Sequence, residues 1–360
     1  MKKHPLLSFL NFVLTPCGFI FPSLLILSIL GQFIRPSSFV FFQWLGLFFP
    51  VLVGINLVLL LYWGLQRRKL FLLPLAALLL NSFSFLKILQ FRWKSPSEES
   101  VVGVSDQTIN VVSYNVRSFQ MDYGGSSLEN VADWVREKNV DVVCLQEVPC
   151  VMPKSILVDA FSFMPYMIVA SKRTGELSVV VFSRFPVQSA VSVSFPERAN
   201  CALISNLNIN GKIIRLLTCH LQTTNWNQLK GENDVDRSFG RNMKHWLMSV
   251  SVINRNYLYR ESQSDFLRKV IEGSSLPTIV CGDFNATPFS YTYRTMKGRL
   301  ADSFQECGTG YTFSYRFLHQ MLQIDYVFYS LHDFTALNYD SPDLQYSDHK
   351  PILVRLSLKN

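Results

Sequence analysis

The chain has 360 residues, of which 34 are Lys or Arg and 26 are Asp or Glu, giving a formal net charge of +8. The whole excess lies in the first 97 residues, which carry nine basic side chains and no acidic one; the remainder holds 25 basic against 26 acidic residues. Proteins that bind the phosphate backbone of nucleic acids generally concentrate basic charge in the binding domain itself. The overall positive charge is therefore no indication of nucleic-acid binding.

Residues 1–94 are predicted to form a membrane region in the lipid bilayer. Two long stretches, Pro5 to Ile34 and Pro36 to Gln66, contain no charged residue, and a shorter uncharged run follows from Leu70 to Leu86. A helix needs about 20 mostly apolar residues to cross a bilayer. We expect about three transmembrane helices, near residues 10–33, 40–65 and 70–90. A cleaved signal peptide is the alternative, but the first apolar stretch is too long and further ones follow it.

The distribution of Lys and Arg between the short loops predicts the orientation in the membrane. Five basic residues lie on the side of the N-terminus and four on the other, and the compact cluster Arg67–Lys69 favours an inside N-terminus. With three spans, the C-terminal domain lies on the extracytoplasmic (periplasmic) side of a multi-pass membrane protein. If the third segment does not span, that domain is cytoplasmic.

A polar linker is expected at residues 95–106, and residues 107–360 are long enough for one large domain with a sizeable core. Strand-like and helix-like segments alternate along this domain. Strands are expected at 109–114, 141–146, 177–182, 187–193, 202–207, 212–218, 278–281, 323–329 and 351–356. Helices are expected at 127–138 and 239–271, and the strands 202–207 and 212–218 should pair as a hairpin.

The run from Ile279 to Asn285 carries the strongest chemical signal. An apolar strand ends at Gly282, and Asp283 and Asn285 follow two residues apart. On an extended segment such residues point to the same side. A carboxylate can orient or deprotonate a water there, and a side-chain amide can donate to an oxyanion. A polar turn after a strand is the simpler explanation of this run taken alone.

Other polar residues also stand in or beside apolar runs, mostly at their ends: Asn115, Glu147, His220, Asp325, Asp348 and His349. Carboxylates, amides and imidazoles without a cysteine motif suit Mg²⁺ or Mn²⁺ rather than a structural zinc. Mg²⁺ is usually held by one or two carboxylates with water and substrate phosphate. This set therefore points to hydrolysis of a phosphoester, and neither a GxSxG motif nor a Gly-rich phosphate loop competes with it.

In chain order the motifs are SYN ending at Asn115, LQE ending at Glu147, FSRFPV from Phe182, TCHL around His220, GDFN ending at Asn285, IDYVF around Asp325 and SDHKPI around His349. Their order and spacing resemble the endonuclease/exonuclease/phosphatase (deoxyribonuclease I-like) superfamily over about residues 107–358. The resemblance implies an α/β fold, a four-layer αββα sandwich, with the site where the two central sheets open.

The resemblance also implies roles for the residues of the motifs. Glu147 matches the main Mg²⁺ ligand, with Asn115 and Asp348 in the metal shell. Asp283 matches the residue that orients or deprotonates the water, and Asn285 the one that holds water and phosphate. His349 matches the catalytic imidazole, with Asp325 as its orienting carboxylate. His220 stands at a position that contacts phosphate or assists the leaving group in many members.

The resulting hypothesis is a membrane-anchored, Mg²⁺-dependent hydrolase acting on a phosphodiester, with Mn²⁺ as the other candidate cofactor. Membrane attachment and a nearly neutral catalytic domain favour a phospholipid, glycolipid, inositol phosphate or other envelope phosphoester as its substrate. One alternative is an extracytoplasmic nuclease that cleaves DNA or RNA. Another, of a different class, is a catalytically inactive membrane scaffold on the same fold, against which the complete set of acids and histidines argues.

Overall fold

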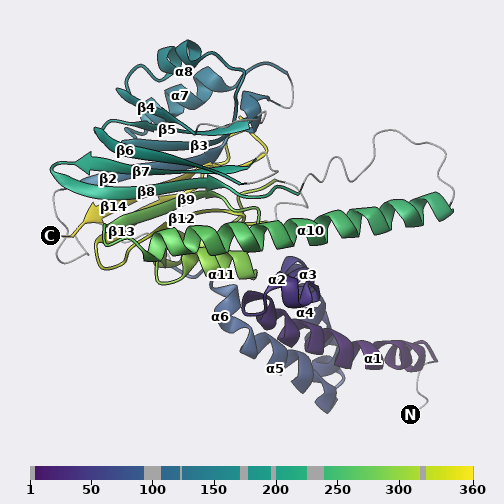
Figure 1. Cartoon of the computed structure of the whole chain (residues 1–360). Helices are drawn as coiled ribbons and strands as arrows, with labels where there is room; N and C mark the ends of the chain where they lie inside the picture. The colour runs from purple at the N-terminus through teal and green to yellow at the C-terminus, as the bar shows by residue number, and fades with distance from the viewer. Residues whose placement is uncertain are drawn as a thin grey trace. The chain divides into compact units, whose positions relative to one another are not determined.

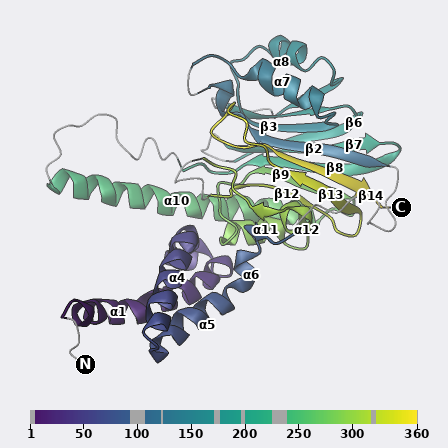
Figure 2. The same ribbon diagram turned by 180° about the vertical axis from the view of Figure 1, so that it is seen from behind.

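The computed structural model describes residues 5–92, 107–121, 124–170, 177–195, 200–224, 239–316 and 322–359, and of residues 239–246 only the backbone. The chain divides into two compact units (Figures 1 and 2). The first comprises Met1–Lys87 and Thr287–Arg294, and the second Ile88–Ala286 and Thr295–Asn360. The linker expected at residues 95–106 lies outside the described residues.

The first unit is helical. Its N-terminal part consists of α1 (Pro5–Leu27), η1 (Ser28–Gln32), α2 (Pro36–Phe39), α3 (Phe41–Leu47), α4 (Phe49–Leu65), η2 (Lys69–Phe71), α5 (Leu72–Leu80) and α6 (Ser82–Phe85). Among the described residues one continuous helical stretch, Pro5–Gln32, is long and apolar enough to cross a membrane, and a second arises if α3 and α4, bent by 68°, form one span.

The third expected span, near residues 70–90, is shorter in the structure. Lys69–Leu80 is an apolar helix of fewer than 18 residues. It ends at Asn81, whose buried side-chain amide donates to the carbonyl oxygens of Leu25 and Ala77, both at 3.0 Å. A polar side chain buried among apolar helices must make such bonds, so Asn81 ties the end of α5 to α1 instead of continuing the helix. The three-span topology stays a prediction.

The second unit contains two six-stranded mixed sheets that are flanked by helices, as expected. One sheet has the order β10 (Ala301–Asp302), β12 (Asp325–Tyr329), β9 (Thr278–Asp283), β8 (Lys212–His220), β7 (Cys201–Ile209), β6 (Val187–Ser194). The other has the order β13 (Phe334–Asp340), β14 (Ile352–Leu358), β2 (Thr108–Asn115), β3 (Val142–Pro149), β5 (Leu177–Ser183), β4 (Tyr166–Val169). Each contains one parallel pair, β8 with β9 and β2 with β3, and its other strands pair antiparallel.

Helices cover the outer faces of the two sheets (Figures 1 and 2). In both views α7 (Leu128–Glu137) and α8 (Lys154–Ala160) lie over the sheet that contains β3 and β5, and α10 (Phe239–Glu272) runs along the other sheet. The remaining short elements are η4 (Arg117–Phe119), α11 (Tyr291–Lys297), α12 (Ser303–Cys307), and the pair β1 (Leu89–Gln90) and β11 (Gly310–Tyr311). This is the four-layer αββα sandwich that the motifs imply.

Alternation along the central strands divides their side chains between two cores. On β2, Val111 belongs to the core between the sheets, whereas Val112 packs with α7 and α8. On β3, Val142 and Val143 divide in the same way. Because side chains of a strand alternate between its faces, a strand covered on both faces is apolar throughout, which explains the unbroken apolar runs in the sequence.

The hairpin expected between residues 202–207 and 212–218 is confirmed. β7 and β8 pair antiparallel up to Ile209 and Lys212, across a turn in which Asn210 and Gly211 both have positive φ, +52° and +90°. Asn and Gly adopt this conformation most readily, and such turns match the twist of paired strands.

Gly282 allows the two parallel strands β8 and β9 to meet at the end of the sheet. It lies opposite Cys219 in the register and has φ +133°. A Cβ atom at this position would be 2.0 Å from the carbonyl oxygen of Cys219. Any side chain would therefore push apart the strands that carry Asp283 and His220.

We expect Gly282→Ala to lower the free energy of unfolding by about 3 kcal/mol or more, because it adds a backbone clash to an unfavourable φ. Gly211→Ala is the matched control, since that glycine also has a positive φ but no described atom lies within 4 Å of the point that a Cβ would occupy. The control should cost about 1 kcal/mol. Urea denaturation of the full chain in detergent measures both, and equal losses would contradict the close approach at Gly282.

Candidate active site

The four residues Asn115, His220, Asp283 and Asp325 share one origin: each continues the inward-facing register of its strand. Asp283, for example, stands two residues after Cys281 of the core between the sheets, and Asp325 two residues before Val327 of the same core. The parallel pairs bring the carboxyl ends of β2, β3, β8 and β9 to the same end of the sandwich, where their antiparallel neighbours β12 and β14 begin. The inter-sheet layer therefore changes from apolar to polar at this end.

Glu147 reaches the site through a β-bulge. The register of β3 with β5 shifts between Leu145 and Val148, and Glu147 has φ +58°. Cys144 belongs to the core between the sheets, so unbroken alternation would turn residue 147 toward the outer layer. The extra residue of a bulge redirects a side chain, and a non-glycine residue with positive φ is a local strain that tends to occur at functional sites.

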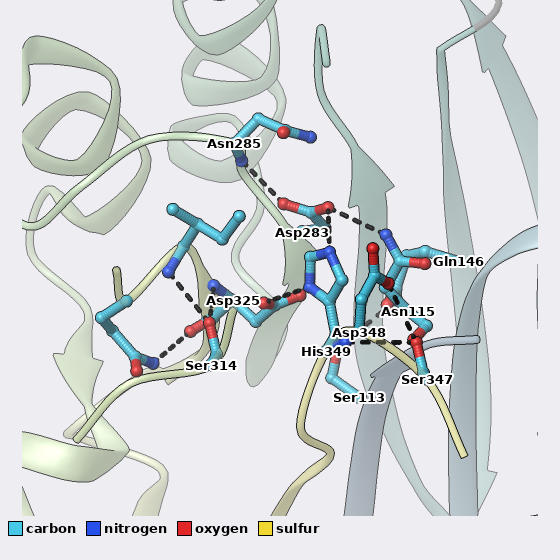
Figure 3. Close-up of polar contacts among 12 residues, drawn as sticks. Ser113, Asn115, Gln146, Asp283, Asn285, Ser314, Asp325, Ser347, Asp348 and His349 are labelled. Atoms are coloured by element: carbon cyan, nitrogen blue, oxygen red, sulfur yellow. Dashed lines mark hydrogen bonds and ion pairs between the residues drawn. The ribbon is translucent and has the colours of Figure 1, made fainter. Parts of the chain in front are cut away.

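Asp283 lies at the centre of the site (Figure 3). Its Oδ2 accepts a hydrogen bond from Asn115 Nδ2 at 3.0 Å, and its Oδ1 accepts one from the backbone N–H of Asn285 at 2.8 Å. Asn115 is in turn fixed by the backbone N–H of Arg117, which donates to its Oδ1 at 3.0 Å. Asn285 has φ +50°, and in this conformation its backbone N–H points back to the carboxylate of Asp283.

The environment of Asp283 disfavours its ionised form. The residue is 1% exposed. Burial, together with the nearby charge of Asp325, raises the pKa of Asp283 to about 8, although His349 and the hydrogen bonds from Asn285 and Asn115 act in the opposite direction. A carboxyl group whose pKa lies near neutrality is suited to accept a proton from water.

His349 and Asp325 form a buried pair beside Asp283 (Figure 3). His349 Nδ1 lies 2.8 Å from Asp325 Oδ2, and its Nε2 lies 3.9 Å from Asp283 Oδ2. Burial lowers the pKa of His349, but the charge and hydrogen bond of Asp325, with the charge of Asp283, outweigh it and raise the pKa to about 10. The hydroxyl oxygen of Ser314 accepts the backbone N–H of Asp325 at 3.0 Å and so fixes the start of β12.

His220 faces the two acids from the end of β8. Its Nε2 lies 3.4 Å from Glu147 Oε1 and 3.7 Å from Asp283 Oδ2, and the hydroxyl of Thr223 lies 2.9 Å from the same nitrogen. Imidazole and carboxylates thus converge on the space between the two sheets.

The loop after His220 is held by α10. Arg260, which is 2% exposed, donates from Nη1 to the carbonyl oxygen of Gln222 at 2.8 Å and to Thr224 Oγ1 at 3.1 Å. Gln263 accepts the backbone N–H of Gln222 at 2.8 Å. The two α10 side chains therefore fix the backbone that carries Thr223 beside His220.

Asp348 lies at the edge of the site and is partly exposed. Its Oδ2 is 3.7 Å from Arg117 Nε, and its Oδ1 accepts from Ser347 Oγ at 3.3 Å. The single hydroxyl hydrogen of Ser347 has a shorter alternative acceptor in the carbonyl oxygen of Asn115, at 2.8 Å, which joins the loop before β14 to the end of β2. In Figure 3 Asp348 is drawn beside Asn115 and His349.

Two groups of described residues present donor atoms close enough to hold a metal ion. They are Glu147 with His220 and Asp283, and Asp283 with Asp325 and His349; within each, the donor atoms lie within 4.8 Å of one another. Asp348 belongs to neither of these groups. Sets of carboxylates and imidazoles without a thiolate have the chemistry that Mg²⁺ and Mn²⁺ accept, so the residues fit such an ion. Asn115 turns its Nδ2 toward Asp283 and its Oδ1 toward the backbone N–H of Arg117.

The structure also assigns positions that the motifs do not single out. Gln146 is completely buried and donates from Nε2 to Ser113 Oγ and Thr218 Oγ1, both at 3.3 Å, which bridges the two sheets below the site. Tyr315 places its ring 4.8 Å from that of His349. Gln146 is the middle residue of the LQE motif and Thr223 stands two residues after the TCHL motif, whereas nothing in the sequence around Ser314 and Tyr315 indicates their role.

The fold has counterparts among solved structures. An endonuclease/exonuclease/phosphatase from Bacteroides vulgatus matches with a TM-score of 0.52 and 18% identity, over 70% of this chain and 99% of that one. The human Nocturnin catalytic domain with bound sulfate gives 0.51 and 16%, over 72% and 96%. An endonuclease/exonuclease/phosphatase from Beutenbergia cavernae gives 0.51 and 16%, over 71% and 72%. At these identities the likeness shows the fold alone.

Sequence comparison covers both units of the chain. Residues 11–88 match a family described as a domain of unknown function. Among curated proteins none matches the chain. Residues 112–349, which contain every one of the predicted site residues, match the model of the Endonuclease/Exonuclease/phosphatase family. The sandwich, the strand-end site and this match together establish that the chain belongs to the endonuclease/exonuclease/phosphatase family.

Proposed function

We propose that the protein is a membrane-anchored phosphoesterase that uses a divalent cation, Mg²⁺ or Mn²⁺, to hydrolyse a phosphodiester by attack of water. The observation that carries this proposal is the position of Asp283. It is buried, it is hydrogen-bonded to Asn115 and to the backbone of Asn285, and its carboxylate lies close to Glu147, His220 and His349.

Each side chain of the site has its own role in the reaction, which follows from its surroundings. Asp283 takes a proton from the attacking water, whose oxygen forms the new bond to phosphorus while the ester P–O bond breaks. Asn285 orients the water and the phosphate. The imidazolium of His349, kept protonated by Asp325, donates to a phosphoryl oxygen on which negative charge increases. His220 stands where it can give a proton to the leaving oxygen.

Glu147 and Asn115 are the residues that would hold the cation, with Asp348 in the outer part of the site. The bound ion would supply charge neutralisation and polarisation at the phosphoryl oxygen. The bulge at Glu147 supports this role, because a strained backbone that redirects one carboxylate toward the other acids is hard to explain by packing alone.

Anchoring is supported by the surface of α1. Within the most apolar 18-residue window of Pro5–Gln32, only 22% of the residues are buried. Phe9, Phe12 and Phe19 are all more than half exposed. A core helix of a soluble protein would be covered, whereas a membrane helix presents such side chains to lipid.

The location follows from the number of spans. With an inside N-terminus, one or three spans place the catalytic unit on the extracytoplasmic side, whereas two spans, with α3 and α4 as one span, place it in the cytoplasm. On the extracytoplasmic side a lipid or other envelope phosphodiester is the favoured substrate. Protease added to right-side-out membrane vesicles should digest the catalytic unit. Protection of that unit in intact vesicles, with digestion after detergent, would place it on the cytoplasmic side.

Loss of either acid should abolish turnover. We expect Asp283→Ala and Glu147→Gln each to reduce Mg²⁺-dependent hydrolysis by about 10³-fold or more, because one removes the proton acceptor and the other a metal ligand. Circular dichroism and the melting temperature should show a folded domain. The control is Asp133→Asn, a change of an exposed acid on α7 that should leave the rate unchanged. Full turnover by Asp283→Ala or Glu147→Gln would refute the assignment.

The substrate class is tested with the full chain in detergent, Mg²⁺ and a panel of phosphoesters. The panel contains phospholipids, inositol phosphates, single- and double-stranded DNA, RNA and bis-p-nitrophenyl phosphate. We expect preference for lipid or small envelope phosphodiesters. Preference for DNA or RNA, with a rate that falls steeply as salt rises, would support the nuclease alternative instead.

The pH dependence should report the pair of His349 and Asp325. The pKa of His349 is raised to about 10, so its imidazolium persists across the neutral range and activity should fall only as the pH rises toward that value. Asp325→Asn removes the charge that raises this pKa. We therefore expect the alkaline limb of the pH–rate profile to move to lower pH in the variant. An alkaline limb that stays in place would exclude His349 as the group responsible.

A further inference from the structure

The first unit contains a segment from far along the chain. Thr287–Arg294 belongs to the same compact unit as Met1–Lys87. In the sequence this segment begins two residues after Asn285, with Ala286 between them. The helical unit therefore receives the chain immediately after the turn that carries Asp283 and Asn285.

Gln43 holds this segment by hydrogen bonds. Its side chain is 2% exposed. Nε2 donates to the carbonyl oxygens of Gly31 at 2.8 Å and Ile34 at 3.1 Å, and Oε1 accepts the backbone N–H of Tyr291 at 3.2 Å. A buried amide with both donors and its acceptor engaged fixes the relative position of the three backbone groups that it joins.

The packing around Phe289 is equally close. Its ring stacks on that of Phe49 with centroids 3.9 Å apart. Gly31 and Gly46 lie against its backbone. At Gly46 a Cβ atom would stand 2.8 Å from the Phe289 carbonyl oxygen, and at Gly31 it would stand 3.1 Å from that oxygen and 2.6 Å from the carbonyl oxygen of Phe42. These two positions therefore require the absence of a side chain.

Cationic side chains complete the set. Lys87 Nζ donates to the carbonyl oxygen of Pro288 at 3.1 Å and to the side-chain amide oxygen of Gln32. The guanidinium of Arg294 lies 4.3 Å from the ring centroid of Phe33. We call Gly31, Gln43, Gly46, Phe49 and Lys87 the socket of the helical unit.

Anchoring alone does not explain the socket. A membrane anchor needs apolar surface of sufficient length, whereas a buried amide, a lysine that donates to a backbone carbonyl and a glycine in contact with the backbone of Phe289 define a specific binding place. The bound segment, moreover, is the exit of the catalytic turn. At the other end of that exit, the carbonyl oxygen of Ala286 accepts the hydroxyl of Tyr326 at 2.8 Å within the second unit.

We propose that the helical unit is a positioning element for the catalytic turn as well as an anchor. By holding Thr287–Arg294, the socket restrains the chain that leaves Asn285 and so keeps the turn, with φ +50° at Asn285, in the conformation in which the backbone N–H of Asn285 donates to Asp283. The effect on turnover rests on the proposed phosphoesterase function, whereas the effect on the order of the turn does not.

The test uses the full-length protein in detergent and two glycine substitutions in neighbouring helices. Gly46→Ala places a methyl group against Phe289, and Gly54→Ala is the matched control, since no described atom lies within 4 Å of a Cβ there. Amide hydrogen exchange is measured over residues 283–294. We expect Gly46→Ala to speed exchange about tenfold both in 287–294 and in the turn 283–285, with Gly54→Ala like the wild type.

Turnover gives a second, independent readout. In Gly46→Ala we expect kcat to fall about tenfold with KM little changed, because a misplaced turn affects the reacting groups more than substrate binding. Lys87→Met, which removes the bond to Pro288, should change both readouts in the same direction by a smaller factor and serves if Gly46→Ala does not fold.

Faster exchange in 287–294 with an unchanged turn 283–285 would overturn the proposal and leave the socket a packing feature only. Unchanged kcat in a variant with a loosened segment would overturn it equally. If the wild type hydrolyses none of the phosphoesters, the proposed function fails, but the exchange of residues 283–285 still decides whether the socket orders the turn.

Discussion

The site depends on the register of four strands. The inward-facing positions of β2, β8, β9 and β12 carry apolar side chains through the middle of the sandwich and then, without change of alternation, Asn115, His220, Asp283 and Asp325 at one end. A one-residue slip of any of these strands would turn its functional side chain to the outer face. The packing of the core between the sheets sets the register of these strands, and the register determines that the polar side chains point toward one another. Gly282 and the bulge at Glu147 depart from regular strand geometry, and both departures bring the acidic side chains together.

Burial determines the ionisation of the central carboxyl group at the polar end. Asp283 is buried, and the neighbouring imidazole of His349 offsets only part of the unfavourable desolvation of its carboxylate. A raised pKa of Asp283 means that its ionisation disfavours the folded, metal-free state: this contribution is absent below the ordinary carboxyl pKa and grows as the pH rises toward about 8. A bound divalent cation would favour the ionised carboxylate. Under the proposed function, lower stability without metal and reactivity with it would thus be opposite consequences of one arrangement, as is common at active sites.

The sequence predicted much of this and missed parts that depend on contacts between distant residues. Short apolar runs located most strands of both sheets, and the motifs at their ends marked the residues that the structure brings together. The run containing β13, whose pairing with β14 shifts between Ala336 and Asn338, was not recognised as a strand because its alternation is broken. The positive φ of Glu147 and the support of Asp325 by Ser314 follow from pairing that no local pattern encodes. The helix in the third apolar run ends at Asn81, and the bond of Asn81 to Leu25 is invisible in the sequence; the span predicted there stays a prediction.

The most direct test of the account is the number of protons released when Mg²⁺ binds. With the pKa of Asp283 at about 8, the metal-free site holds a proton at pH 7 that a nearby cation should expel. Calorimetric titration of the full chain with Mg²⁺, in two buffers of different ionisation enthalpy, should show release of about one proton per chain at pH 7 and fewer as the pH rises. Asp283→Asn should largely abolish the release. Binding of Mg²⁺ without proton release, or with the same release in Asp283→Asn, would contradict the claim that this buried carboxyl group is the centre of a metal–phosphate site.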